Sequence, residues 1–302
     1  MKTIKDVFNA FKQGLLNVYD AHETEALTLL VLNEITGSSK ARLKAFPEEE
    51  LQPGQAEKIN SILVRLQTGE PVQYILGHTE FYGLTFKVSP AVLIPRPETE
   101  ELVEWALASV GSLQRAVSSG EQLPVGGGQW AVGHILDIGT GSGCIAISLK
   151  KNLPEAQVMA MDISSNALVI AKQNADFNDI NILFNQTDIL NTEKSVLKNV
   201  NFDVIISNPP YVTEHDKTPM HHNVMGFEPH TALFVPEDNP LLFYKAIADF
   251  AMSNLNPNGL LFLEINENLG KETVELLESK GFKNIELRKD MSGRDRMIRA
   301  AR

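Results

Sequence analysis

Four short apolar segments in the second half of the chain have the pattern of buried strands. Nearly continuous apolar runs of this length are typical of strands that are covered on both faces of a parallel sheet. Stretches of helical period lie between them, notably residues 164–177 and 240–255. This alternation predicts a doubly wound α/β domain. The strands are expected at residues 134–139 (HILDIG), 157–163 (QVMAMDI), 202–207 (FDVIIS) and 260–265 (LLFLEI).

The first 67 residues follow a different pattern. Residues 25–35 (EALTLLVLNEI) and 56–66 (AEKINSILVRL) place apolar side chains at helical spacing, and turn signals stand at Gly37 and at Pro53-Gly54. Because no stretch of this region alternates in the manner of a strand, we expect a small all-helical domain.

The residue pattern changes again from Gly69, and aromatic and β-branched residues alternate around Gly83. Such a pattern predicts a β-hairpin. We therefore predict three parts: a helical N-terminal domain that docks a substrate over residues 1–78, a linker hairpin over 79–98 and the α/β domain over 99–302. Within the last part, residues 118–128 (SSGEQLPVGGG) have the composition of a surface loop.

Composition indicates a globular protein of the cytoplasm. The chain has 302 residues, of which 43% are hydrophobic and 22% are charged, which suits one or two domains with a full core. No apolar run approaches the roughly 18 residues that a membrane span needs, and the first residues interleave charge with apolar side chains, unlike a signal peptide. The single cysteine, Cys144, cannot pair within the chain, which suits a reducing compartment.

The formal charge of −11 argues against broad binding to nucleic acid. Nonspecific affinity for nucleic acid depends on clustered Lys and Arg side chains that neutralise phosphates. Local basic patches can still occur on an acidic protein. Charge balance also leaves the binding of a small cofactor open.

A glycine-rich loop after the first predicted strand indicates a nucleotide-like ligand. It joins the strand to a helix, and its three alternating glycines allow a tight turn with close approach of a ligand to the backbone. Asp162 ends the second strand about 20 residues later, where an acidic side chain can bind the two hydroxyls of a ribose. The loop residues are Gly139, Thr140, Gly141, Ser142 and Gly143.

The spacing of these glycines favours a cofactor with a ribose but without a pyrophosphate. An NAD-binding loop carries a third glycine three residues after the second, whereas Gly143 is followed here by Cys144, Ile145 and Ala146. S-adenosylmethionine is a cofactor that fits this description.

The strand at residues 202–207 runs directly into Asn208-Pro209-Pro210-Tyr211. Two consecutive prolines stiffen the turn and remove two backbone donors, so its carbonyls stay free to accept hydrogen bonds. The Asn208 amide can both accept and donate, and Tyr211 offers a flat face on which a planar group can stack. The tetrapeptide suits a planar nitrogen that carries hydrogens, although an ordinary turn after a strand has the same composition.

Together these motifs resemble class I methyltransferases that act on planar amide or amino nitrogens. The stretch before the glycine loop is more specific and resembles the bacterial peptide chain release factor N5-glutamine methyltransferases, the PrmC/HemK family. The resemblance covers the chain from about residue 69 to its end. It is carried by Gly69-Glu70-Pro71, Tyr74 to Gly77, Phe81 to Leu84, Val92 to Glu100, Lys289-Asp290, Gly293 and Asp295-Arg296.

The resemblance implies a fold, a reaction and roles for individual residues. It implies a Rossmann-like, mostly parallel sheet of seven strands and methyl transfer from S-adenosylmethionine to the glutamine of a Gly-Gly-Gln loop in a release factor. The glycine loop would hold the methionine part of the cofactor, Asp162 its ribose, and Ile189 would flank the adenine. Asn208, Pro209, Pro210 and Tyr211 would bind the substrate glutamine, with Asn208 also touching the cofactor. Some relatives place Trp at position 189, and a Gly is usual where this chain has Asn266.

Three other interpretations of the function stay open at this point. Asn-Pro-Pro-Tyr also suits the amino group of adenine, as in a nucleic-acid adenine-N6 methyltransferase. A related glutamine methyltransferase acts on a ribosomal protein, although Pro97-Glu98-Thr99-Glu100 favours the release-factor branch. A non-catalytic adaptor would have no need of intact glycines and a complete tetrapeptide. We expect a monomer that binds neither nucleic acid nor membrane directly.

We expect no metal site and no nucleophilic cysteine. Cys144 starts a helix just after the glycine loop, where a buried thiol is the commoner role. Histidines and carboxylates do gather after the tetrapeptide, but their spacing matches no compact zinc pattern. These residues are Glu214, His215, Asp216, His221, His222, Glu228 and His230.

Overall fold

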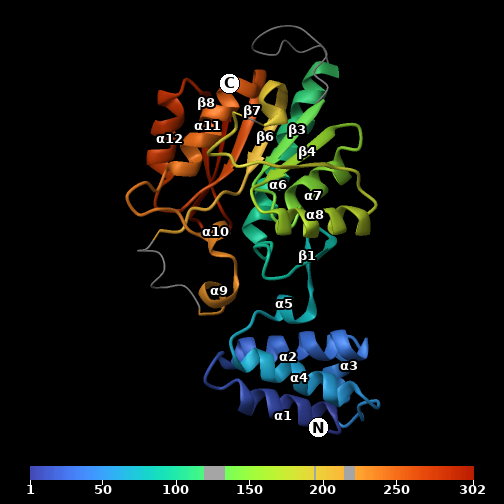
Figure 1. Cartoon of the computed structure of the whole chain (residues 1–302). Coiled ribbons are helices and arrows are strands. Elements are labelled where there is room, and N and C mark those ends of the chain that lie inside the picture. The colour runs from blue at the N-terminus through green and yellow to red at the C-terminus, as the bar shows by residue number, and fades with distance from the viewer. Residues whose placement is uncertain (119–132, 194, 214–221) are drawn as a thin grey trace. The chain divides into compact units, whose positions relative to one another are not determined.

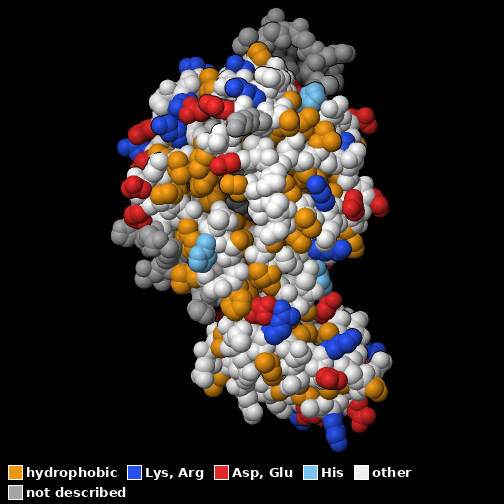
Figure 2. Space-filling model, in the orientation of Figure 1, with side chains coloured by type: hydrophobic (Ala, Val, Ile, Leu, Met, Phe, Trp, Pro, Cys, Tyr) orange, Lys and Arg blue, Asp and Glu red, His pale blue; other side chains and the backbone are white. Residues whose placement is uncertain are grey.

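The computed structural model describes residues 1–118, 133–193, 195–213 and 222–302, which fall into two compact units. The first comprises Met1–Gly77 with α9 (His222–Phe227), and the second comprises the rest of the described chain. Acidic and basic side chains are interspersed over the visible face of each unit (Figure 2). No helix among the described residues is long and apolar enough to cross a membrane. The expected loop at 118–128 lies, after Ser118, outside the described residues.

The first unit is built from helices whose apolar faces share one core. The side chains of Phe11, Leu32 and Leu66 are completely buried in it. Thr3 and Asp6 form a reciprocal capping box at the start of the first helix, which satisfies two backbone donors there. The expectation of an all-helical N-terminal region is confirmed. Its helices are α1 (Ile4–Gly14), α2 (Ala21–Thr36), α3 (Lys40–Ala45), α4 (Gln55–Gln67) and α5 (Val72–Leu76).

The second unit contains a seven-stranded sheet with the order β5-β4-β3-β6-β7-β9-β8 (Figure 1). The first five strands in this order run parallel, and β9 pairs antiparallel with both β7 and β8. The mostly parallel α/β fold is therefore confirmed. The strands are β3 (His134–Ile138), β4 (Gln157–Asp162), β5 (Leu183–Gln186), β6 (Phe202–Ser207), β7 (Leu255–Glu264), β8 (Lys283–Lys289) and β9 (Asp295–Ala301).

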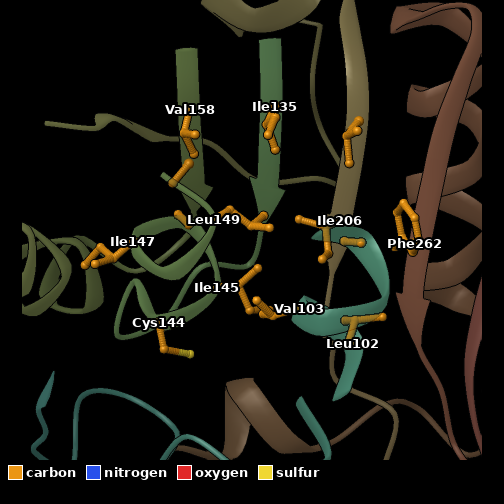
Figure 3. Packing of buried hydrophobic residues seen from close by; sticks show 14 of the residues in the cluster. Leu102, Val103, Ile135, Cys144, Ile145, Ile147, Leu149, Val158, Ile206 and Phe262 are labelled. Atoms are coloured by element: carbon orange, nitrogen blue, oxygen red, sulfur yellow. The ribbon is translucent and has the colours of Figure 1, made fainter. Parts of the chain in front are cut away.

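Alternate residues of the central strands face opposite sides of the sheet. Ile135 and Ile206 pack with α6 (Pro97–Ser118) and α7 (Cys144–Asn152), as Figure 3 shows. Their neighbours Leu136 and Ile205 belong to a second core. The helices that contribute to this second core are α11 (Leu242–Asn254) and α12 (Gly270–Ser279). Burial on both faces explains why these strands are nearly continuous apolar runs.

The expected hairpin packs within the second unit. It consists of β1 (His78–Phe81) and β2 (Leu84–Lys87), which pair antiparallel. Asn174, on α8 (Ser165–Phe177), is completely buried and accepts from the Lys87 backbone N–H at 2.7 Å. Its Nδ2 donates to the carbonyls of Lys87 at 3.0 Å and Ser142 at 2.9 Å. One amide thus joins the hairpin to the glycine loop. The boundaries at residues 78 and 98 stay predictions.

Replacing this amide tests that connection. We expect Asn174→Ala to lower the free energy of unfolding by about 2 to 3 kcal/mol, because buried backbone groups lose their partners. Asn178→Ala is the control at the end of the same helix, since the Asn178 Nδ2 donates to the carbonyls of Thr85 and Asn174. This control should lower the free energy of unfolding by about 1 kcal/mol or less. Urea unfolding at equilibrium measures both values, and equal losses would contradict the role given to Asn174.

Asp137 is a completely buried carboxyl on β3. Its Oδ2 accepts from the Thr140 hydroxyl at 2.6 Å and from the Ala146 N–H at 3.2 Å. Its Oδ1 has no hydrogen-bond partner among the described residues. Burial raises the pKa of Asp137 to about 7, and the two hydrogen bonds oppose that rise only in part.

This raised pKa predicts a pH-dependent stability. In the unfolded chain the carboxyl titrates near pH 4, so between about pH 4 and 7 only the folded state keeps the proton. The contribution of Asp137 to the free energy of unfolding therefore falls as the pH rises to about 7 and is constant above it. We expect Asp137→Asn to lose this dependence. Urea unfolding of the cofactor-free wild type and variant at pH 5 and pH 7.5 measures this dependence. An identical change in the free energy of unfolding between the two pH values in both proteins would refute the assignment.

Candidate active site

A pocket of about 330 Å³ lies at the carboxyl ends of β3, β4 and β6 in the second unit. The chain leaves β3 toward β4 on one side and later returns to β6 on the other, so the strand order reverses here. Ligands of open α/β sheets bind at such a point. Of the predicted site residues, the pocket wall includes Gly139, Gly141, Asp162, Ile189, Asn208, Pro209 and Pro210.

The glycine loop adopts the tight turn that its sequence predicts. Gly139, Gly141 and Gly143 have φ angles of 71°, 55° and 83°, in the left-handed region that favours glycine. A Cβ atom at Gly139 or Gly141 would meet nothing within 4 Å, whereas one at Gly143 would meet the Ile147 side chain at 3.0 Å. The first two glycines therefore leave room for a ligand, and the third lets the next helix pack closely. Neither Gly143 nor the side chains of Thr140 and Ser142 line the pocket.

Asp162 links the ends of β3 and β4. Its Oδ2 accepts from the Gly141 N–H at 2.8 Å, and its Oδ1 accepts from the Ser164 N–H at 2.8 Å. Burial raises the pKa of Asp162, and these two backbone bonds oppose the rise. The carboxylate thus shapes the glycine loop and also forms part of the pocket wall.

An apolar wall stands beside Asp162. Ile189 lines the pocket as expected, together with Ile163, which the sequence reasoning did not single out. Ile163 is 57% exposed, which is unusual for a large aliphatic residue beside a buried strand. Its position directly after Asp162 was the available signal, since residues that follow a strand end face the ligand edge of the sheet.

The two halves of the Asn-Pro-Pro-Tyr turn face different surroundings. Asn208, Pro209 and Pro210 line the pocket. Tyr211 is not among the lining residues; its ring packs against the second core, and its hydroxyl donates to Glu264 Oε1 at 3.0 Å. Burial raises the pKa of Tyr211 well above its ordinary value. The stacking surface expected from Tyr211 is therefore turned toward the protein interior.

A polar network that the sequence reasoning missed holds this turn. Asn208 Nδ2 donates to Thr99 Oγ1 at 3.0 Å, and the Thr99 hydroxyl donates to Glu264 Oε2 at 2.7 Å. Thr99 lies in the first turn of α6, and Glu264 is the last residue of β7. Asn266 donates from Nδ2 to the Tyr211 carbonyl at 3.0 Å. No motif spacing connects these residues along the sequence.

A partly buried ion pair holds the segment after the turn. Glu228 is 3% exposed and accepts hydrogen bonds from the Arg96 guanidinium and from the Ile94 N–H. Pro229 and Phe234, which follow it, line the pocket. This contact joins Arg96, which precedes α6, to the segment that begins at Glu228. The segment includes the short helix α10 (His230–Leu233).

The remaining candidates show no catalytic arrangement among the described residues. Cys144 is buried, and burial raises its thiol pKa to about 12, which disfavours the nucleophilic thiolate. The described residues contain no group of three or more His, Cys, Asp or Glu side chains that could hold a metal ion. Residues 214–221, which include several of the histidines and carboxylates considered above, lie outside the described residues.

The pocket fits a nucleoside that carries a positively charged amino-acid part. Asp162 offers carboxylate oxygens at its wall, and Ile163 and Ile189 offer apolar surface for a planar base. The space over Gly139 and Gly141 admits a ligand close to the backbone.

Two family profiles match separate parts of the chain. The one described as "Methyltransferase small domain" matches residues 122–226, and "PrmC N-terminal domain" matches residues 11–77. Among solved structures, the T. thermophilus 16S rRNA N2 G1207 methyltransferase in complex with AdoMet and guanosine aligns with a TM-score of 0.50 at 18% identity. That alignment covers 74% of this chain and 49% of the other. The likeness shows a methyltransferase fold.

Relatives that match over nearly the full length identify the family more specifically than the fold does. The release factor glutamine methyltransferase of Flavobacterium psychrophilum is 46% identical over 98% of both chains. That of Bacteroides thetaiotaomicron is 39% identical over 96% of this chain and 97% of its own. The helical N-terminal unit, the mostly parallel sheet and these matches agree with the resemblance read from the linker motifs. The chain belongs to the family of release factor glutamine methyltransferases.

Proposed function

We propose that this protein transfers a methyl group from S-adenosylmethionine to the side-chain amide nitrogen, N5, of the glutamine in the Gly-Gly-Gln loop of peptide chain release factors. Full-length relatives that carry this name support the proposal. The observation that carries it is one pocket whose wall includes both Asp162 with the glycine loop and Asn208 with its prolines. A donor site and an acceptor site for the methyl group are thereby adjacent.

The first half of the pocket suits the cofactor. Gly139 and Gly141 would receive its methionine part, Asp162 its ribose hydroxyls, and Ile163 with Ile189 would enclose the adenine. When bound, S-adenosylmethionine supplies a methyl group on a positively charged sulfur. Thr140, Ser142 and Gly143 would act by shaping the loop, because Gly143 N–H donates to the Thr140 carbonyl and the Ser142 carbonyl accepts from Asn174.

The second half of the pocket suits a primary amide. An amide nitrogen is a poor nucleophile because its lone pair is delocalised into the carbonyl group. The Asn208 side-chain oxygen and the Pro209 carbonyl can accept its two N–H bonds, which fixes the nitrogen and stabilises the positive charge that grows on it. Pro209 and Pro210 each fix a φ angle, so the turn that carries the Pro209 carbonyl is stiff. Catalysis would then come from positioning and electrostatics.

Tyr211 would contribute by holding the turn. Its buried hydroxyl and its carbonyl are bound to Glu264 and Asn266. The segment from Glu228 to Phe234 borders the same pocket and would lie near the substrate loop. We also propose that residues 1–78 form the domain that docks the release factor, that residues 79–98 link it to the catalytic domain over 99–302, and that the protein works as a monomer in the cytoplasm.

A nucleic-acid adenine-N6 methyltransferase is the alternative, because the same turn suits an adenine amino group. The net charge of −11 and the interspersed charges on the visible face of the second unit (Figure 2) give it less support. Glutamine methylation of a ribosomal protein is a closer variant of the favoured reaction. Both can be distinguished by their substrates.

Transfer of a labelled methyl group tests the proposed function directly. The purified protein and labelled S-adenosylmethionine are incubated in parallel with a bacterial release factor, its Gly-Gly-Gln→Gly-Gly-Ala variant, a ribosomal protein fraction and unmethylated DNA. We expect label on the intact release factor alone. Label on DNA alone, or equal label on the Gln→Ala variant, would overturn the proposal.

Asn208→Ala tests the assignment of the catalytic turn. Loss of the side-chain oxygen should lower turnover of the release factor by at least about a hundredfold, as removal of a charge-stabilising group does in other enzymes. The dissociation constant for S-adenosylmethionine should stay measurable and change by less than about tenfold, because most of its proposed contacts come from other residues. Steady-state kinetics and calorimetry measure the two quantities. Normal turnover in the folded variant would exclude this mechanism.

A further inference from the structure

Two buried side chains and the half-buried Asn208 form a hydrogen-bonded series that ends at the pocket. Glu264 is 1% exposed and Thr99 is 2% exposed, while Asn208 reaches the pocket wall. The order of contacts is Glu264 Oε2 to Thr99 Oγ1 at 2.7 Å and Thr99 Oγ1 to Asn208 Nδ2 at 3.0 Å. The other carboxylate oxygen of Glu264 accepts from Tyr211, three residues after Asn208. One carboxylate is thus connected to both ends of the turn.

The donors and acceptors of this series can be arranged in only one way while Glu264 is ionised. A carboxylate only accepts hydrogen bonds, so Thr99 must donate its single hydroxyl proton to Glu264. The Thr99 oxygen can then only accept, and Asn208 must turn its NH2 group toward it. The opposite end of the Asn208 amide, its oxygen, is left for the pocket.

The groups around Glu264 shift its pKa in opposite directions. Burial raises the pKa of Glu264, and the hydrogen bonds from Thr99 and Tyr211 oppose that rise. Arg296 on β9 also opposes it through its positive charge, whereas Glu98 on α6 adds to it. The two hydroxyl donors and the nearby guanidinium are partners suited to a carboxylate.

We propose that Glu264, acting through Thr99, is a positioning residue that fixes the Asn208 amide with its oxygen toward the methyl-accepting nitrogen. The inference rests on the proposed function, because it assumes that this oxygen accepts a substrate N–H bond. A reversed Asn208 amide would present its own NH2 group to the substrate NH2 group. The contact would then be repulsive and would oppose the charge that grows during methyl transfer.

Tyr211 has a related role at the other end of the turn. Its hydroxyl donates to the second oxygen of Glu264, and its carbonyl accepts from Asn266. Asn266 is itself fixed, since its backbone N–H donates to the Tyr244 hydroxyl at 3.0 Å. Glu264 and Asn266 therefore hold Tyr211 through both its hydroxyl and its carbonyl.

A pair of substitutions at Thr99 separates the hydroxyl from the rest of the side chain. Thr99→Val keeps the shape but removes the hydroxyl, and we expect kcat on the release factor to fall about tenfold or more. Thr99→Ser keeps the hydroxyl and should restore kcat to within about threefold of the wild type. The dissociation constant for S-adenosylmethionine should stay within about twofold in both variants. A role in packing alone would not separate Val from Ser in this way.

Two further variants complete the test. Thr273→Val is the matched control, because Thr273 is also buried but donates to the carbonyl of Leu269, the residue that precedes its own helix. It should leave kcat within about twofold of the wild type. Glu264→Gln keeps the size of the side chain but adds an NH2 group that can donate to Thr99 and so reverse the series. We expect it to lower kcat at least as much as Thr99→Val, and it serves as the test if Thr99→Val does not fold.

The outcomes distinguish this inference from the proposed function. If the wild type methylates the release factor and Asn208→Ala does not, while Thr99→Val and Glu264→Gln turn over within twofold of the wild type, the positioning role is wrong and the proposed function stands. If the wild type does not methylate the release factor, the proposed function is wrong and the positioning role fails with it. Loss of kcat in Thr99→Val with recovery in Thr99→Ser supports both.

Discussion

The buried carboxylate of Glu264 is the constraint on which the arrangement of the acceptor site depends. A charged group with 1% exposure needs hydrogen-bond donors, and the donors that meet it come from distant parts of the chain. Thr99 lies in the first turn of α6, and Tyr211 lies in the turn after β6. Satisfying one carboxylate therefore brings the Pro-Glu-Thr-Glu segment and the Asn-Pro-Pro-Tyr turn together at the end of β7.

The donor site depends on a second carboxylate in a similar way. Asp162 accepts backbone N–H groups from Gly141 and Ser164, so it ties the loop after β3 to the turn after β4. Asn174 adds a link from this loop to the hairpin. Because β3 lies between β4 and β6, the two sites share one pocket at the point where the strand order reverses. The fold thus places the donor site beside the acceptor site, and the carboxylates of Asp162 and Glu264 fix the local geometry of each site.

Much of this arrangement could be predicted from the sequence. The buried strands β3, β4 and β6 were predicted to within one residue at either end, because burial on both faces leaves nearly continuous apolar runs. The strand β9 was not predicted, and neither were the two edge strands β5 and β8. Their sequences, LFNQ and KNIELRK, are short or strongly polar, since little of their surface is buried. Motif positions after strands also placed Gly139, Asp162 and Asn208 at the pocket.

The contacts that organise the site could not be predicted in the same way. Thr99 and Glu264 are 165 residues apart, and Arg96 and Glu228 are 132 residues apart. Neither pair has a spacing that a local pattern could detect, because tertiary packing brings the partners together. Tyr211 was expected to offer a stacking face, but its ring packs against the second core, and its hydroxyl donates to the distant Glu264.

The most direct measurement is the environment of the Asn208 side-chain amide in solution. Nuclear magnetic resonance of protein labelled with ¹⁵N at asparagine can detect its NH2 protons and the protons close to them. The account predicts nuclear Overhauser contacts from these protons to the Thr99 side chain and exchange with water that is slower than for exposed asparagines. Rapid exchange without any contact to Thr99 would contradict it, because the amide would then be free to turn its NH2 group toward the pocket.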